Sequence, residues 1–197
     1  MKQRNFQGGK PALIINEEKY HIKDCCPEPI TVPIEVEAVW AFITPKQKNP
    51  QTPVKYIALC ALYYRGPKST TKQELFDHIA TTYHYLCSKY GHGIDFIIAG
   101  DTNRLSLSPI LNLSPHLQQV VKVPTRLNPD RILDPIITTL KKYYCAPITK
   151  TPLNPDVGKT GKPSDHLVVT MIPITATQQI QPRVYKQLKP DQLNLLG

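Results

Sequence analysis

The sequence lacks the features that direct a chain to a membrane or to secretion. It contains no run of roughly 18 apolar residues, the length that a membrane-spanning helix needs. Its first ten residues, MKQRNFQGGK, contain no apolar core of a signal peptide. We therefore expect an intracellular protein that is not secreted and does not contact a membrane.

The cysteines also form no motif that indicates a disulfide framework or a zinc site. The five cysteines are odd in number, and no C-x-x-C pair occurs. This argues against a disulfide framework and against a structural zinc site, and it is consistent with a reducing compartment. We also find no internal repeat and no low-complexity block. The sequence therefore gives no reason to expect a solenoid.

What the chain does contain is positive charge and proline. Its 197 residues include 41% hydrophobic residues and carry a formal net charge of +9, which suits a single globular domain with affinity for polyanions. Residues 141–197 hold eight Lys or Arg against three Asp. Basic tails can also simply aid solubility, so charge alone leaves both interpretations open. The 20 prolines predict short elements and many loops.

Hydrophobic periodicity predicts a fold in which strands outnumber helices. The spacing of apolar residues predicts a helix over 70–91. Alternating or continuous apolar runs predict strands over 11–16, 33–44, 54–64 and 94–100. The one convincing helix connects two of these strands, so we expect an α+β fold, a layered sheet sandwich flanked by helices.

The C-terminal half has weaker patterns. We expect a short helix within 109–121, a strand over 131–139, a loop over 145–163 and a last strand over 166–174. Because a proline interrupts the strand at 131–139, we predict an edge or bulged strand there. Residues 175–197 read as a basic, polar tail or linker.

Polar residues gather where the expected strands begin or end. Asp101 and Asn103 follow the strand 94–100, Asp134 lies in an apolar run, and Asp165 and His166 open the last strand. Gly, Asp and Asn are common in ordinary turns, which is one interpretation of each cluster. The other is an active site, because strand-end loops present reactive groups on a rigid scaffold.

Four motifs in order resemble the endonuclease/exonuclease/phosphatase superfamily. They are 100-GDTN-103 at a strand end, 164-SDH-166 opening the last strand, 131-RILD-134 between them, and Tyr63 at the end of a core strand. Tyr64 matches the last of these less well. The resemblance covers about residues 8–174, and it implies the layered fold of that superfamily. We accordingly expect a partial domain over 1–174, followed by the tail 175–197.

The endonuclease domain of non-LTR retrotransposons is the branch that the sequence resembles most. The stretches 8-GGKPALIIN-16, 38-AVWAFITP-45, 124-PTR-126 and 131-RILDPII-137 look like that branch. The tail segment 183-RVYKQLKPDQL-193 looks like the start of a linker to a further domain. The resemblance implies DNA as the partner and a nuclear location.

The resemblance also implies residue roles in a hydrolysis that a divalent metal assists. Asp101 would orient and deprotonate the attacking water, and Asn103 would position that water or the phosphate. His166 would donate a hydrogen bond to a phosphate oxygen, and Asp134 would belong to the same acidic and histidine network. Tyr63 would contact the phosphate or assist departure of the leaving group.

The same resemblance implies a metal ligand and a DNA surface. Asp165 would help to bind Mg²⁺ or Mn²⁺, and no small-molecule cofactor is expected. Magnesium prefers oxygen ligands and retains several waters, so a few carboxylates suffice. Arg104, Arg126, Lys159 and Lys162 could contact the DNA backbone. For the two arginines, pairing with a carboxylate is an equally good interpretation.

The sequence departs from the family pattern at its start. The family begins with strands that carry an Asn and a metal-binding Glu, and no residue before Gly8 matches them. We therefore expect a weak or inactive endonuclease. The alternatives are a phosphoesterase for small phosphoesters and a remnant that binds nucleic acid without catalysis. The sequence makes no prediction of oligomeric state.

Overall fold

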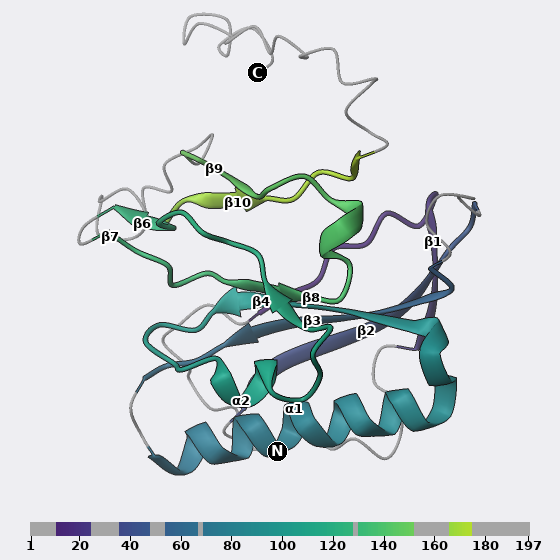
Figure 1. Cartoon of the computed structure of the whole chain (residues 1–197), viewed down its shortest axis with the longest axis horizontal. Coiled ribbons are helices and arrows are strands. Elements are labelled where there is room, and N and C mark those ends of the chain that lie inside the picture. The colour runs from purple at the N-terminus through teal and green to yellow at the C-terminus, as the bar shows by residue number, and fades with distance from the viewer. Residues whose placement is uncertain are drawn as a thin grey trace, which may run out of the picture.

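A six-stranded mixed sheet forms the centre of the protein (Figure 1). The computed structural model describes residues 11–24, 36–47, 54–66, 69–127, 130–151 and 166–174. Within these residues the strand order of the sheet is β1-β2-β3-β4-β8-β5. The strands are β1 Tyr20–Asp24, β2 Glu37–Pro45, β3 Tyr56–Tyr63, β4 Ile94–Asp101, β8 Ile136–Thr138 and β5 Gln118–Gln119.

Two small sheets and a few helices complete the described part of the chain. The small sheets pair β9 (Ile148–Lys150) with β10 (Val168–Thr170) and β6 (Arg126–Leu127) with β7 (Asp130–Arg131). The helices are α1 Ser69–Tyr90, α2 Ser108–Leu111 and the 3-10 turns η1 Gly91–Gly93 and η2 Lys141–Tyr143. None of these described helices is long and apolar enough to cross a membrane.

Helix α1 connects the two parallel strands β3 and β4. Parallel neighbours need a long crossover, and α1 provides it. The helix lies along one face of the sheet in Figure 1, where Leu75, Ile79 and Leu86 are buried against Phe96 and Ile98 of β4. The predicted helix over 70–91 is thus confirmed, because its apolar stripe is the surface that covers the sheet.

The opposite face of the sheet is covered differently. Strand side chains alternate between faces, so Phe96 and Ile98 point toward α1, whereas Ile97 and Ala99 pack in smaller clusters on the other side. One of these clusters includes Val169 of β10, and Figure 1 shows β9 and β10 above this face. The structure thus confirms the predicted α+β layering.

The N-terminal end differs from the prediction in two ways: one predicted strand does not form, and one strand was not predicted. Residues 11–16 form no strand, although Leu13 and Ile15 pack against the sheet and Ile14 is fully exposed. Their alternation therefore reflects packing without ladder pairing. The edge strand β1 was missed because its sequence, YHIKD, has few apolar residues; its pairing with β2 contains an irregularity between Ile22 and Asp24.

The strand predicted over 131–139 is shorter and more central than expected. Strand β8 begins at Ile136, directly after Pro135, and lies between β4 and β5. The prediction of an edge or bulged strand was wrong because the proline precedes the ladder and removes no donor from it. All three residues of β8 are buried, as a strand inside the sheet requires.

The remaining C-terminal predictions are confirmed only in part. The expected helix within 109–121 is the single turn α2, followed by turns and β5. The expected loop over 145–163 contains β9, and the last strand is reduced to β10, which pairs with β9 outside the main sheet. Residues 152–165 and the predicted tail 175–197 lie outside the described residues.

Candidate active site

The site is built at the C-terminal end of β4, where the strand stops pairing with its parallel neighbour. In the register of the sheet, Asp101 lies beside Tyr63 of β3, which in turn faces Glu37 of β2. Directly opposed residues share a face of the sheet, so these three form one row on the face away from α1. Asp101 and Tyr63 are half-buried.

Gly100 allows this strand end to form. Its φ of 145° lies in a region that residues with a side chain rarely adopt. A Cβ atom at this position would lie 1.8 Å from the backbone oxygen of Leu62. The glycine of the 100-GDTN-103 motif therefore has a steric cause, because β3 and β4 approach too closely for any side chain between them.

The turn after Asp101 is held by its own polar groups. The backbone N–H of Asn103 donates to Asp101 Oδ1 at 2.8 Å, and Asn103 has a left-handed φ of 49°, which Asn tolerates better than most residues. The Asn103 side-chain amide donates to the backbone oxygen of Tyr64 at 2.5 Å. Because an amide nitrogen has two hydrogens, one donor remains for a phosphate or a water.

The buried hydroxyl of Thr125 fixes the second carboxylate of the site. Thr125 is fully buried, and its Oγ1 accepts hydrogen bonds from the backbone N–H groups of Leu133 at 2.9 Å and Asp134 at 3.0 Å. Its backbone oxygen accepts the N–H of Leu167 at 2.7 Å, the residue next to His166. Thr125 therefore positions both Asp134 and the segment that carries His166.

The Asp101 turn is joined to the same framework by Thr102. The backbone N–H of buried Thr102 donates to the Leu133 oxygen at 2.8 Å, and its hydroxyl donates to the same oxygen at 3.1 Å. Leu133 thus links the turn after β4 to the turn that carries Asp134. These bonds explain how acids 33 residues apart in sequence meet in one place.

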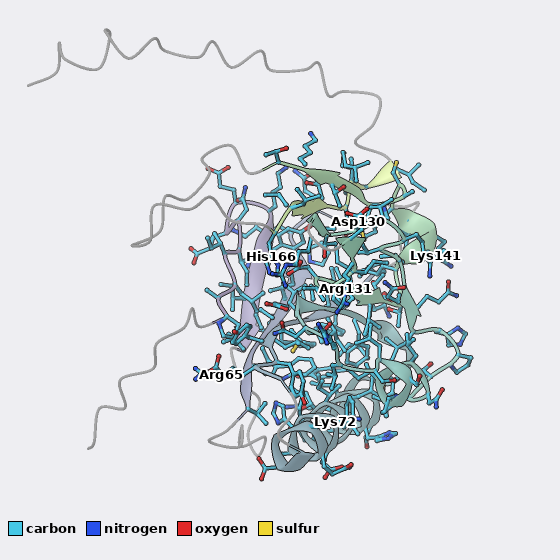
Figure 2. All side chains as sticks on the ribbon, turned by 90° about the vertical axis from the view of Figure 1, so that its left-hand side faces the viewer. Arg65, Lys72, Asp130, Arg131, Lys141 and His166 are labelled. Atoms are coloured by element: carbon cyan, nitrogen blue, oxygen red, sulfur yellow. The ribbon has the colours of Figure 1, made fainter. Side chains whose placement is uncertain are left out.

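Asp101, Asp134 and His166 form a compact titratable cluster. One ligand atom of each lies within 4.8 Å of the others. The Nδ1 atom of His166 lies 2.9 Å from Asp134 Oδ2 and 3.2 Å from Oδ1, so the carboxylate orients the ring. Figure 2 labels His166, which makes an isolated β-bridge with Arg126.

Burial raises the pKa of Asp101 above its ordinary value of 3.8. The backbone N–H of Asn103 opposes this shift, the Asp134 carboxylate reinforces it, and His166 and Arg126 oppose it further. A carboxylate with a raised pKa is a better proton acceptor near neutral pH than an ordinary surface aspartate. The environment of Asp101 is therefore the one that a general base needs.

The structure brings together some of the predicted site residues. Asp101, Asn103, Asp134 and His166 meet in the cluster described above, and Tyr63 stands beside Asp101, whereas Tyr64 is buried. Of the predicted DNA contacts, Arg126 forms a β-bridge with His166 and acts electrostatically on Asp101. Arg104 is exposed in the turn after β4. Asp165, Lys159 and Lys162 lie outside the described residues.

Sequence reasoning missed the residues that support the site. Thr125 stands in the stretch 124-PTR-126, but nothing in a lone threonine signals a buried acceptor.

Glu37 is hydrogen-bonded to Arg65, at the margin of the domain in Figure 2. It occupies the same cross-strand row as Asp101, yet among the described residues it is not part of the group that could share a metal ion.

The donor set fits a divalent cation. Two carboxylates suit Mg²⁺ or Mn²⁺, and an imidazole nitrogen suits several transition metals. Because Nδ1 of His166 already contacts Asp134, the carboxylate oxygens of Asp101 and Asp134 are the better ligands for Mg²⁺. The arrangement combines a basic carboxylate, an oriented imidazole and an amide donor at one strand end.

Comparison with known proteins identifies the fold. No protein-family model and no curated protein matches the sequence. Among solved structures, an endonuclease/exonuclease/phosphatase family protein from Bacteroides thetaiotaomicron is similar, with a TM-score of 0.51 and 12% identity over 79% of this chain and 66% of that one. A conserved protein of unknown function from Enterococcus faecalis has a TM-score of 0.51 and 12% identity, over 80% of this chain and 69% of that one.

The catalytic domain of human nocturnin is also similar, with a TM-score of 0.49 and 15% identity over 78% of this chain and 59% of that one. The chain thus spans about three fifths to two thirds of the length of these structures. We conclude from the Bacteroides thetaiotaomicron structure that the described part of the chain has the fold of the endonuclease/exonuclease/phosphatase proteins, as the motifs predicted.

Proposed function

We propose that the protein hydrolyses phosphodiester bonds in DNA with the help of a divalent metal, as a retrotransposon-type endonuclease domain over residues 1–174. The observation that carries this proposal is the convergence of Asp101, Asp134 and His166 within 4.8 Å at the end of β4. Surface aspartates gather by chance, but here buried Thr125 and Thr102 hold the two acidic turns together.

Each side chain has a distinct role in this proposal. Asp101 accepts the proton of the attacking water, which its raised pKa favours. Asp134 accepts the Nδ1 hydrogen of His166, so Nε2 can donate to a phosphate oxygen as negative charge develops. The second amide hydrogen of Asn103 positions the phosphate, and the Tyr63 hydroxyl reaches it from β3.

Asp101 and Asp134 would hold the metal, with Asp165 as a further ligand. The ion would supply Lewis-acid stabilisation of the charge on phosphorus-bound oxygens. Mg²⁺ is our first choice because the two carboxylates offer oxygen ligands. A direct test that does not need activity is titration with Mn²⁺ followed by the broadening of nuclear magnetic resonance signals, which should be centred on residues 101–103 and 134.

DNA is the proposed substrate because the chain carries a net charge of +9, Arg126 lies beside His166, and Arg104 is exposed in the turn that follows Asp101. Contacts from lysines and arginines to phosphates provide sequence-independent affinity that falls with salt. Lys159 and Lys162 would extend this surface, and a DNA substrate implies a nuclear location. The proposed relation to retrotransposon endonucleases rests on the sequence stretches that resemble the endonuclease domain of non-LTR retrotransposons.

Plasmid nicking tests the proposal. The full chain is incubated with supercoiled DNA in Mg²⁺, in Mn²⁺ and in EDTA, together with Asp101→Ala, His166→Ala and the control His84→Ala. His84 is an exposed histidine on α1, so its loss should leave nicking unchanged. We expect metal-dependent nicking that both site variants abolish, and its rate tests the expectation of weak activity.

Two other outcomes would replace the proposal. Hydrolysis of a soluble phosphomonoester without nicking would favour a phosphoesterase that acts on small substrates. Salt-sensitive DNA binding without cleavage, by a folded sample, would favour a nucleic-acid-binding protein that lacks catalysis. Nicking that survives in Asp101→Ala would contradict the assignment of the base.

A further inference from the structure

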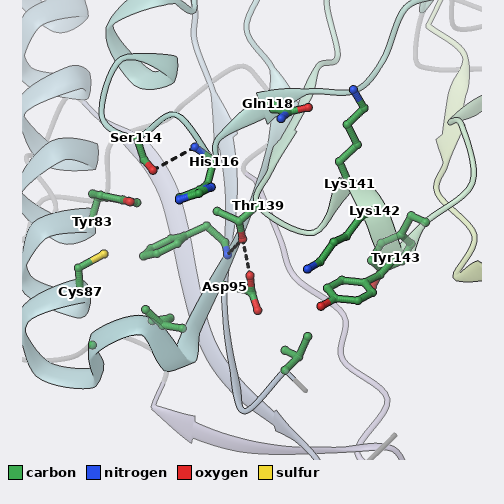
Figure 3. Close-up of a pocket in the computed structure, with 15 residues that line it drawn as sticks. Tyr83, Cys87, Asp95, Ser114, His116, Gln118, Thr139, Lys141, Lys142 and Tyr143 are labelled. Carbon is green, nitrogen blue, oxygen red and sulfur yellow. Dashed lines mark hydrogen bonds between the residues drawn. The ribbon is translucent and has the colours of Figure 1, made fainter. Parts of the chain in front are cut away.

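A polar cavity lies at the other end of β4. It has a volume of about 850 Å³ and is bounded by α1, the first residues of β4, the loop before β5 and the segment around η2. Figure 3 shows this cavity, with Asp95 near its centre and Tyr83, Ser114, His116, Lys141 and Lys142 around it. Asp95 is six residues from Asp101 along the strand, which corresponds to about 20 Å.

The cavity lining is rich in hydrogen-bond donors. Lys141 and Lys142 carry ammonium groups, and Gln118 carries an amide, whereas the hydroxyls of Ser114 and Tyr83 are hydrogen-bonded to each other. Burial raises the pKa of Tyr83 and of Tyr144, which also lines the cavity, so both phenols keep their hydrogens near neutral pH. A lining with this excess of donors fits a ligand that is rich in acceptors and negatively charged.

The lysines are placed on two sides of the space. Lys142 Nζ lies 4.8 Å from the centre of the Tyr143 ring, and in Figure 3 its side chain extends over that ring toward Asp95. Lys141 follows the rim in the other direction, toward Gln118. An anionic group at the rim and a planar group beside Tyr143 could therefore be bound at the same time.

Asp95 adds a carboxylate acceptor to this lining. The Thr139 hydroxyl donates to Asp95 Oδ1 at 2.7 Å and accepts the N–H of Phe96 at 3.0 Å, as the dashed lines in Figure 3 show. This relay fixes the carboxylate at the start of β4. A carboxylate has about four lone-pair sites, so Asp95 can still accept from the amino or ring N–H groups of a base.

We propose that this cavity binds a nucleotide, either free or as the 5′-phosphorylated end of a nucleic-acid strand. The phosphate lies at Lys141 on the rim, and the base lies on the side of the Tyr143 ring, within reach of Asp95 and Lys142. Sites for small molecules usually have volumes of about 300–1,000 Å³ with a few convergent polar groups, and this cavity falls in that range. The inference goes beyond the proposed hydrolysis and does not depend on it.

Calorimetric titration of the full chain tests the inference. The probes are AMP, a 5′-phosphorylated DNA tetranucleotide and inorganic phosphate, all in EDTA so that no metal at the Asp101 cluster can hold a phosphate. The variants are Lys141→Gln/Lys142→Gln and the matched control Lys72→Gln/Lys89→Gln, which removes two exposed lysines from α1. All four positions are exposed, so each variant should fold.

We expect the cavity variant to weaken nucleotide binding by about tenfold or more, since hydrogen bonds from charged donors are the strong ones, and the control to change it less than about twofold. AMP binding as tightly as the tetranucleotide identifies a free nucleotide as the ligand. Binding of the tetranucleotide alone identifies a strand end. Either result supports the site.

Three results would overturn the inference. They are no binding of either nucleotide by the wild-type chain, equal weakening in the two double variants, and inorganic phosphate binding as tightly as AMP. Asp101→Ala separates this inference from the proposed function. Nucleotide binding in EDTA should persist in that variant even if the chain proves to have no nuclease activity.

Discussion

The two ends of β4 place the same residue type in different surroundings. Asp95 and Asp101 lie on the same face of the sheet, because six residues separate them on a strand whose side chains alternate. Asp95 is bound by the Thr139 hydroxyl. Asp101 instead faces a second carboxylate and an imidazole, with one ligand atom of each within 4.8 Å.

The difference shows how surroundings assign a role to a carboxylate. At the Asp95 end, a neutral hydroxyl satisfies the acid, which leaves a fixed acceptor in a donor-rich cavity and suits binding. At the Asp101 end, burial and the Asp134 charge act against ionisation, which suits proton transfer. The strand itself is the rigid spacer that keeps the two environments apart.

The sharpest test of this comparison is the substitution Asp101→Asn, which preserves shape and removes the base. We expect the rate of metal-dependent nicking to fall by about 10²–10⁴-fold, the usual contribution of a general base. Asp77→Asn is the control, because Asp77 is an exposed carboxylate on α1 that bonds to Gln73. Initial nicking rates measure both, and equal losses would refute the special role of Asp101.

The glycines next to the strand ends provide a second test, on stability. Gly100→Ala places a Cβ 1.8 Å from the Leu62 oxygen at a φ of 145°, and we expect a loss of roughly 3–5 kcal/mol in the free energy of unfolding. At Gly93, before the other end of β4, a Cβ would meet only side-chain carbons at 3.7 and 4.0 Å.

We therefore expect Gly93→Ala to change the unfolding free energy by less than about 1 kcal/mol. Urea unfolding followed by circular dichroism compares the two variants. If Gly93→Ala destabilised the protein as much as Gly100→Ala does, the close approach of β3 and β4 at the site would not be the reason for the glycine.

Thr125 tests whether the Asp101 end depends on buried support. Thr125→Val leaves the N–H groups of Leu133 and Asp134 without their acceptor, and we expect a loss of roughly 2–3 kcal/mol. Thr82 is the matched control, because its Oγ1 is buried without a hydrogen-bond partner within the described residues. Thr82→Val should therefore be neutral or slightly stabilising.

The nicking assay adds a result that a purely structural role would not give. Under conditions where both variants are folded, Thr125→Val should lower the nicking rate and Thr125→Ser should restore it, because serine keeps the hydroxyl. A Thr125→Val variant with full activity would mean that Asp134 needs no positioning by this bond.

The fold elements that the sequence predicted best are those with long, regular patterns. The α1 stripe and the apolar runs of β3 and β4 have enough residues to define a period, and each is found where it was expected. The short strands were not predictable in this way. Strand β8 has three residues and β5 has two, so their places in the sheet depend on tertiary contacts that no local pattern records.

The candidate site shows a similar division. Asp101, Asn103, Asp134 and His166 could be proposed because polar residues at strand ends are visible in a sequence and match a family pattern. Thr125 and Thr102 could not, because a threonine whose hydroxyl bonds to buried backbone groups looks in a sequence like any other threonine. The cavity at the Asp95 end was missed entirely, since its lining comes from segments between residues 54 and 144.

The smallest expected effect is the contribution of Asp101 to the pH dependence of the free energy of unfolding. Burial raises the pKa of Asp101 in the folded protein above the ordinary value of 3.8 that the unfolded chain retains. Below pH 3.8 the group is protonated in both states and has no effect. As the pH rises from 3.8 toward the folded-state pKa, the unfolded chain ionises before the folded protein does, and the folded protein loses stability until both states are ionised.

The substitution Asp101→Asn removes this pH-dependent loss of stability, because an amide does not ionise, and it keeps an oxygen that can accept the Asn103 N–H. The variant should therefore be more stable than the wild type at pH 7, by less than about 1 kcal/mol because solvent screens a half-exposed carboxylate. The gain should disappear below pH 3.8. Urea unfolding at pH 7 and pH 3.5 measures both quantities. A wild-type protein more stable than Asp101→Asn at pH 7 would mean that the site stabilises the charged carboxylate, and Asp101 would then act as a metal ligand alone and not as the base.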